Sequence, residues 1–147
     1  MIRLLPVTPD NWRVRLEVSE AQKGFVAPPE VILARAWAYR NERANAFMIY
    51  ADDTPVGMAL YYDDDEYGCY DLSQLFIDER FQGRGYGSEA LRQLLEMMTA
   101  DGRYPKVSLC YIDGNTESER LYGKFGFYRT YEEEEGDEEL MMEKLLR

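Results

Sequence analysis

The chain has 147 residues, and 46% of them are hydrophobic, so it can bury the core of one domain and is too apolar to be disordered. It carries 28 acidic residues against 17 basic ones, and the net charge of −11 disfavours nucleic acid and anionic membranes as partners. The same charge favours a small cationic partner.

The absence of histidine excludes a Ser-His-Asp triad and a Cys-His pair. The sequence contains two cysteines, Cys69 and Cys110, and this small set of ligands disfavours a structural zinc site, so we expect no metal. These cysteines allow one disulfide but indicate no disulfide framework, which favours a reducing, cytoplasmic location. No segment approaches the roughly 20 apolar residues of a membrane span, so we expect no membrane partner.

The first half of the chain predicts a strand, a helical region and three further strands. IRLLPV (2–7) is typical of a strand, and Thr8 and Pro9 suit the cap and first turn of a helix. Apolar spacing predicts helical structure from about residue 9 to residue 41, broken near residues 24–29. Aromatic and β-branched residues then predict strands at 46–51, 55–62 and 69–78. Turn-type residues between these strands favour antiparallel hairpins.

In the second half, apolar residues at spacings of three and four predict an amphipathic helix over 88–100. A strand at 106–112 follows, and a helix that connects it to the strand at 69–78 makes the two strands parallel.

A last helix is predicted to start near Thr116, which has capping-box spacing to Glu119, and to stop at Gly126. Residues 127–131 and 139–146 resemble a closing pair of strands. The chain shows no repeat and no linker, so we expect a single mixed α/β domain over 1–147.

The stretch QGRGYG (82–87) places three glycines between a predicted strand and a predicted helix. Glycine costs backbone entropy on folding, so this cluster indicates that the backbone itself is used. A helix N-terminus presents unpaired N–H groups with partial positive charge, and Arg84 adds a cation. A phosphate or pyrophosphate is therefore the expected ligand, although the loop fits neither the Walker A motif nor the dinucleotide motif.

Two stretches resemble motifs of the GNAT family of N-acetyltransferases. LFIDERFQGRGYGSEAL (75–91) is similar to motif A, [QR]-x-x-G-x-[GA], and NTESERLYGKFGF (115–127) is similar to a later motif, an Asn followed by a Tyr and a Gly-Phe. The matching residues are Gln82, Gly85, Gly87, Asn115, Tyr122, Gly126 and Phe127. The order of strands and helices also matches over nearly the whole chain. The resemblance implies a mostly antiparallel sheet of about seven strands, with a parallel, V-shaped splay between the middle strands and helices on both faces.

The resemblance also implies a site for acetyl-CoA between the strand that ends at Ile77 and the strand at 106–112. The pantetheine arm would pair with the main chain of Leu75, Phe76 and Ile77. The pyrophosphate would meet the loop residues Gln82, Gly83, Arg84, Gly85, Tyr86, Gly87 and Ser88. Asn115 would hold the cofactor from the other side, and Tyr122 would protonate the departing thiolate.

Acetyl transfer from a thioester to an amine needs a neutral amine, a polarised carbonyl and a proton for the leaving sulfur. A main-chain N–H near Ile77 suits the carbonyl oxygen, and a tyrosine suits the sulfur because the two groups have similar pKa values. Many members of the family place a carboxylate where this chain has Ser73. Asp71 shares the face of Ser73 in a regular strand, so we expect it to act as the base through water, with a water chain to bulk solvent as the alternative. We interpret Cys110 as a buried structural thiol near the cofactor.

Acidic runs at 63–66 and 132–135 lie where the family places its acceptor amine. They favour a polyamine such as spermidine or spermine, although a solvated charged surface is the alternative for each run. Together with the glycine loop, residues 19–36, an acceptor-side segment in this family, resemble bacterial spermine/spermidine acetyltransferases. A protein N-terminus, an amino sugar, a xenobiotic amine or a basic peptide remain alternative acceptors, and coenzyme A binding without turnover is the alternative to catalysis. Dimers are common in the family, and an aromatic content of 14% allows a homodimer.

Overall fold

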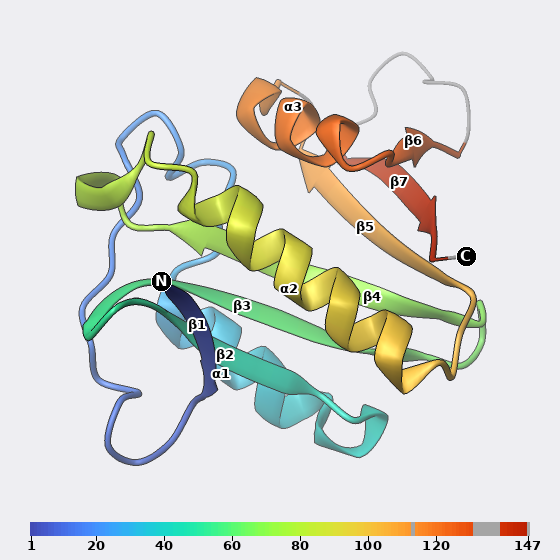
Figure 1. The fold of residues 1–147 in the computed structure, drawn as a ribbon, viewed down its shortest axis with the longest axis horizontal. Coiled ribbons are helices and arrows are strands. Elements are labelled where there is room, and N and C mark those ends of the chain that lie inside the picture. Colours follow the sequence, from blue (N-terminus) through green and yellow to red (C-terminus); the bar gives the residue numbers. More distant parts are fainter. Residues whose placement is uncertain (113, 131–138, 147) are drawn as a thin grey trace.

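The structure is a computed structural model that describes residues 1–112, 114–130 and 139–146. These residues form one seven-stranded sheet, in the order β1-β2-β3-β4-β5-β7-β6, with helices on both faces (Figure 1). The strands are β1 (Ile2–Pro6), β2 (Asn45–Ala51), β3 (Thr54–Asp64), β4 (Cys69–Ile77), β5 (Lys106–Ile112), β6 (Tyr128–Arg129) and β7 (Glu139–Leu145). The α-helices are α1 (Pro29–Ala38), α2 (Tyr86–Asp101) and α3 (Thr116–Lys124), and the 3-10 helices are η1 (Arg40–Glu42) and η2 (Glu79–Phe81). The predicted mixed α/β fold is confirmed.

The parallel pair β4–β5 gives the sheet its opening. Pairing between these strands is limited to Tyr70 with Val107 and Asp71 with Ser108, whereas the other neighbouring strands are antiparallel. Beyond these pairs the two strands diverge (Figure 1). The predicted V-shaped splay is therefore present, and it exposes the second half of β4 on the side of β5.

Two apolar clusters hold the helices against the sheet. α2 buries its apolar face in the larger cluster, through Ala90, Leu91, Leu94, Leu95 and Met98. α1 covers the opposite face, where Ile32 is fully buried. Each such aliphatic side chain contributes about 1.5–3 kcal/mol when it leaves water. No helix within the described ranges is long and apolar enough to cross a membrane.

Both ends of α3 are capped. Gly126 has φ 89°, its N–H donates to the carbonyl of Gly123, and the next N–H donates to the carbonyl of Tyr122, so the predicted stop is confirmed. The predicted capping box is wrong, because the cap is one residue earlier than Thr116. Asn115 Oδ1 accepts a hydrogen bond from the N–H of Ser118 at 3.2 Å, and asparagine is a strong cap.

The helix predicted between residue 9 and residue 24 is wrong, whereas α1 and η1 confirm the helical structure after the break. The segment forms turns, and it packs on the sheet through Leu16, which is buried. The main-chain N–H of Glu17 donates to Asp78 Oδ2, and its carbonyl accepts from the N–H of Glu79, each at 2.8 Å. These tertiary hydrogen bonds replace helical ones, because the apolar residues Val14, Leu16 and Val18 alternate with polar ones instead of following a helical spacing.

One residue of the acidic run at 63–66 is buried in an ionic network. Asp63 belongs to β3, is buried, and forms ion pairs with Arg43 at 2.6 Å and with Arg103 at 3.2 Å. Arg43 also pairs with Asp101 at the end of α2, at 2.9 Å. The expectation that the whole run faces the acceptor is wrong for Asp63, because its carboxylate is buried and paired with Arg43 and Arg103. The run at 132–135 lies outside the described residues.

Candidate active site

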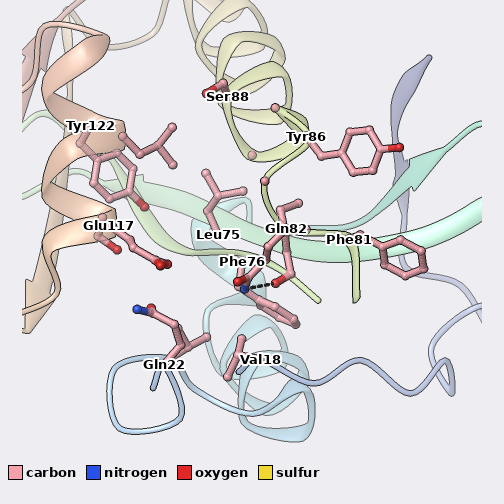
Figure 2. A pocket seen from close by; sticks show the side chains of 17 residues that line it. Val18, Gln22, Leu75, Phe76, Phe81, Gln82, Tyr86, Ser88, Glu117 and Tyr122 are labelled. Atoms are coloured by element: carbon pink, nitrogen blue, oxygen red, sulfur yellow. Dashed lines mark hydrogen bonds between the residues drawn. The ribbon is translucent and has the colours of Figure 1, made fainter. Parts of the chain in front are cut away.

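A cavity of about 280 Å³ lies where the end of β4, the glycine loop and α3 meet (Figure 2). Its lining includes the predicted residues Leu75, Phe76, Ile77, Gln82, Gly83, Gly85, Tyr86, Gly87, Ser88 and Tyr122. Sequence reasoning did not identify Val18, Gln22 or Val26, which complete the wall from the N-terminal segment. The structure therefore brings most of the expected cofactor residues together around one space.

The glycine loop leaves this space open to main-chain N–H groups. Gly83 and Gly85 have φ 77° and 80°, in the left-handed region that favours glycine, and an added Cβ at either position would meet no atom within 4 Å. Gly85 caps α2 without a side-chain hydrogen bond from any described residue. The start of this 16-residue helix therefore suits an anion, and the pyrophosphate contact expected from the sequence stays a prediction.

Three expected cofactor residues have other contacts in the structure. Gln82 ties the loop to β4, because its Nε2 donates to the carbonyl of Ile77 at 3.0 Å (Figure 2). Arg84 is exposed over the ring of Phe81 and is not among the described residues that line the cavity. Asn115 is 3% exposed and caps α3. The contacts of these three residues with the cofactor stay predictions.

Tyr122 presents a phenol to the cavity from α3. Its ring packs against Phe127, with the ring centroids 5.5 Å apart, and its hydroxyl points into the space beside Leu75 (Figure 2). Burial raises the pKa of Tyr122 above its usual value of 10.0. The hydroxyl therefore stays protonated at neutral pH, as a proton donor requires.

A second cavity, of about 440 Å³, continues along β4. Gln74 lines the second cavity and Leu75 lines the first, while Val26 lines both, so the two cavities are neighbours along β4. A β-bulge shapes this junction, since Leu60 pairs with Gln74 and Tyr61 pairs with Leu72. Ser73 is the extra residue of the bulge, and both Ser73 and Gln74 line the second cavity.

Asp71 lines the second cavity, with Arg35, Tyr62 and Glu139 around it. Burial and the nearby charge of Asp64 raise the pKa of Asp71 from 3.8 to about 6, while Arg35 and a hydrogen bond from Tyr62 act against the rise. A carboxylate with a pKa of about 6 is matched to proton abstraction near neutral pH. The arrangement can therefore hold a cationic group and accept a proton from it.

Residues 12–127 match the model of the Acetyltransferase (GNAT) family. The chain belongs to this family. It is 30% identical to a spermine/spermidine N(1)-acetyltransferase of Bacillus subtilis (strain 168), over 98% of this chain and 99% of the relative.

Solved structures show the same GNAT fold. An acetyltransferase from Thermus thermophilus superposes with a TM-score of 0.77 at 20% identity, over 98% of this chain and 96% of that one. The spermidine N-acetyltransferase from Vibrio cholerae in complex with CoA and spermine superposes with a TM-score of 0.76 at 13% identity, over 99% and 95% of the two chains. The predicted family is confirmed.

The second cavity of this GNAT domain contains further residues that sequence reasoning missed. Arg35 and residues 24–27 belong to the segment whose resemblance suggested an acceptor-side role, but nothing in the sequence singled out Arg35, Tyr62 or Glu139. Both cysteines are free thiols, so the one disulfide that they allowed is absent. The interpretation of Cys110 as buried is wrong, because β5 alternates and turns Leu109 and Tyr111 into the core while Cys110 faces the second cavity. The described residues of this GNAT domain hold no group of three or more acidic or cysteine side chains placed to bind a metal ion.

Proposed function

We propose that this GNAT protein transfers an acetyl group from acetyl-CoA to a polyamine such as spermidine or spermine. The two neighbouring cavities along β4, which share Val26, are the main support for this proposal. One has an open glycine loop and a protonated phenol, and the other contains carboxylates and a base of suitable pKa.

The glycine loop and the end of β4 that line the first cavity suit a coenzyme A carrier. The N–H groups of the loop at 82–88 suit the pyrophosphate, and the unpaired side of Leu75–Ile77 suits the amides of the pantetheine arm. When bound, acetyl-CoA supplies an acetyl group activated as a thioester. The Vibrio cholerae neighbour was solved with CoA, which supports this use of the fold.

In the proposed reaction Asp71 and Tyr122 move the protons. Asp71 removes a proton from the ammonium group of the acceptor, directly or through water, because its carboxylate is ionised above about pH 6. The neutral amine then forms its bond to the acetyl carbon as the C–S bond breaks. Tyr122 gives its proton to the leaving sulfur and takes back the second proton that the acetylated nitrogen loses, and a main-chain N–H near Ile77 stabilises charge on the carbonyl oxygen. Proton transfers of this kind contribute about 10²–10⁴-fold each to enzymatic rates.

The second cavity favours an acceptor with several positive charges. Asp71 and Glu139 line it, and Asp64 lies close enough to raise the pKa of Asp71. A unit charge 4 Å from an opposite one gains about 4 kcal/mol near a protein surface, so a polycation gains more than a monoamine. The Bacillus subtilis relative, which is named for spermine and spermidine, supports this choice over its whole length. A cytoplasmic location and a homodimer stay predictions from the sequence.

A thiol-release assay with purified protein and acetyl-CoA tests the proposal. The acceptors are spermine, spermidine, putrescine, lysine, a basic peptide and an aminoglycoside. Saturable release with spermine or spermidine is the expected result. Release with the peptide or the aminoglycoside alone would retain the chemistry and refute the polyamine. If no acceptor gives release while acetyl-CoA still raises the melting temperature, the protein binds the cofactor without turnover.

A further inference from the structure

Asp78 is a buried carboxylate at the end of β4, where the chain leaves the sheet for the glycine loop. It follows Ile77, it is 1% exposed, and its own N–H donates to the carbonyl of Val56 on β3 at 2.7 Å. An aspartate is almost never fully buried unless its oxygens are paired or hydrogen-bonded. The partners of Asp78 therefore indicate why a charge is retained at this position.

The two carboxylate oxygens of Asp78 bind two different segments. Oδ1 accepts from the main-chain N–H and from Nε of Arg80 in η2, each at 2.9 Å. Oδ2 accepts from the main-chain N–H of Glu17 at 2.8 Å and from Arg80 Nη2 at 3.2 Å. The carbonyl of Glu17 in turn accepts from the N–H of Glu79 at 2.8 Å. Asp78 thus joins the end of β4 both to the turn before the glycine loop and to the segment before α1.

The residues that follow Glu17 form a wall that the two cavities share, residues 18–27. Figure 2 shows Val18 and Gln22 on this shared wall, across the first cavity from Ser88. The wall contributes Val18, Gln22 and Val26 to the first cavity and Gly24, Phe25, Val26 and Ala27 to the second. Its position therefore decides the shape of both cavities.

The shared wall has few other directional attachments. The N–H groups of Phe25 and Val26 both donate to the carbonyl of Gln22, within the wall itself. In the described part of the chain, the two hydrogen bonds of Glu17 are those that join residues 13–27 to the sheet and to η2. Leu16 adds apolar packing, since it is 3% exposed and belongs to the same cluster as Phe76. Because apolar packing is not directional, the hydrogen bonds of Glu17 fix where the wall lies.

Resting on the proposed function, we propose that Asp78 is a positioning residue, whose hydrogen bond to Glu17 holds the shared wall in place and so sets the affinity of the second cavity for the polyamine. Asp78 is not among the described residues that line either cavity, so it acts through Glu17 and the wall. The glycine loop has an anchor of its own, from Gln82 to the carbonyl of Ile77. Loss of the bond to Glu17 therefore affects the wall more than the loop.

Asp78→Asn tests this role with almost no change of shape. Two donors of Arg80 face Oδ1 and keep an oxygen there, so the amide nitrogen takes the place of Oδ2. It then faces the N–H of Glu17, and two donors cannot bond. Amide hydrogen exchange, followed by mass spectrometry without substrates, should become about tenfold faster or more in peptides covering 13–27, since a hydrogen bond to a charged group is lost. Peptides from α2 should stay protected, which verifies that the variant is folded.

Turnover separates positioning from a general loss of structure. At saturating acetyl-CoA, Asp78→Asn should raise the KM for the polyamine at least about threefold and leave kcat within about twofold, because a displaced wall lowers the binding-competent fraction and a bound acceptor restores it. A smaller amount of folded enzyme would instead lower kcat and leave KM unchanged. Glu20→Gln is the matched control, since Glu20 lies in the wall, accepts from Lys23 Nζ at 2.7 Å and is absent from the described lining of both cavities. It should change neither the exchange nor the KM.

Equal exchange of residues 13–27 in wild type and Asp78→Asn overturns the inference. Faster exchange with an unchanged KM for the polyamine also overturns it, because the wall would then not set the affinity for the acceptor. If Asp78→Asn does not fold, NMR exchange in wild type decides. A Glu17 amide hydrogen that exchanges as fast as that of Val18 overturns the role of Asp78, and one that exchanges at least about tenfold more slowly supports it.

The measurements also separate this inference from the proposed function. If wild type acetylates no amine, the proposed function fails. The exchange without substrates still decides whether Asp78 holds the shared wall.

Discussion

Asp71→Asn is expected to make the protein more stable at neutral pH while it removes activity. The pKa of Asp71 is about 6 in the folded protein and 3.8 without burial, so folding favours the protonated acid. The stability that this group contributes is present below the unfolded value of 3.8 and is lost as the pH rises through about 6. At pH 7.5 the folded protein holds an ionised, partly buried carboxylate at a cost that a neutral amide avoids.

The magnitude follows from the pKa. A rise from 3.8 to about 6 corresponds to about 3 kcal/mol, at about 1.4 kcal/mol per pH unit. Because Asp71 is only partly buried, solvent screens some of this cost, and we expect a gain of about 1–2 kcal/mol. A domain of this size gains about 3 °C in Tm per kcal/mol. The same change should lower kcat/KM by about 10²-fold, because the amide cannot accept the proton.

Urea unfolding followed by circular dichroism at pH 4 and pH 7.5 measures the gain in the free energy of unfolding. Most of the gain should disappear at pH 4, where the wild-type side chain is largely protonated in the folded state. Asp53→Asn is the matched control, since Asp53 is an exposed carboxylate, and it should change stability by less than about 0.5 kcal/mol at both pH values. Equal stability of wild type and Asp71→Asn at pH 7.5, or an equal gain at both pH values, would refute the reasoning.

Further changes test other parts of the molecule. Tyr122→Phe should lower kcat in the thiol-release assay by about 10²-fold or more and leave the KM for acetyl-CoA unchanged, and an unchanged kcat would exclude Tyr122 as the acid. Gly85→Ala forces a side chain into φ 80° at a cost of about 1–2 kcal/mol and should raise the KM for acetyl-CoA. Gly123→Ala, in α3 with open space around it, should instead stabilise the fold by up to about 1 kcal/mol. Arg43→Met should destabilise the fold by about 2–4 kcal/mol in urea unfolding, because Asp63 stays buried with Arg103 alone, and a loss below 1 kcal/mol would contradict that role.

Features that depend on nearby residues could be predicted from the sequence. The spacing of apolar residues gave α2 to within two residues at each end, and the glycines gave its open N-terminus and the stop after α3. Glycine conformation and helical periodicity are local properties, so a short stretch of sequence contains the information. The same holds for the motif A residues Gln82, Gly85 and Gly87, which line the first cavity.

Features that depend on distant partners could not be predicted. The alternation of apolar residues argues against a helix before α1, but the partner of Glu17 in that segment is Asp78, 61 residues later in the chain. Asp63 was expected to face the acceptor, whereas it pairs with Arg43, 20 residues away, and the contact between Arg35 and Ser73 spans 38 residues. Tertiary contacts override local preference at these positions, and no pattern in the sequence indicates which residues will meet.

The short pairing between β4 and β5 also divides the sheet into two ladders, which we expect to open separately. β1–β4 form one continuous antiparallel ladder and β5, β7 and β6 form another, while among the described residues only two pairs join the ladders. Local opening follows such seams, so amide hydrogens at the ends of β5 and β7 should exchange with solvent through a sub-global opening that leaves β1–β4 protected. A ligand in the first cavity would contact β4 on one side and α3 on the other. Its binding would therefore stabilise the folded state where the two ladders are joined by the fewest pairs.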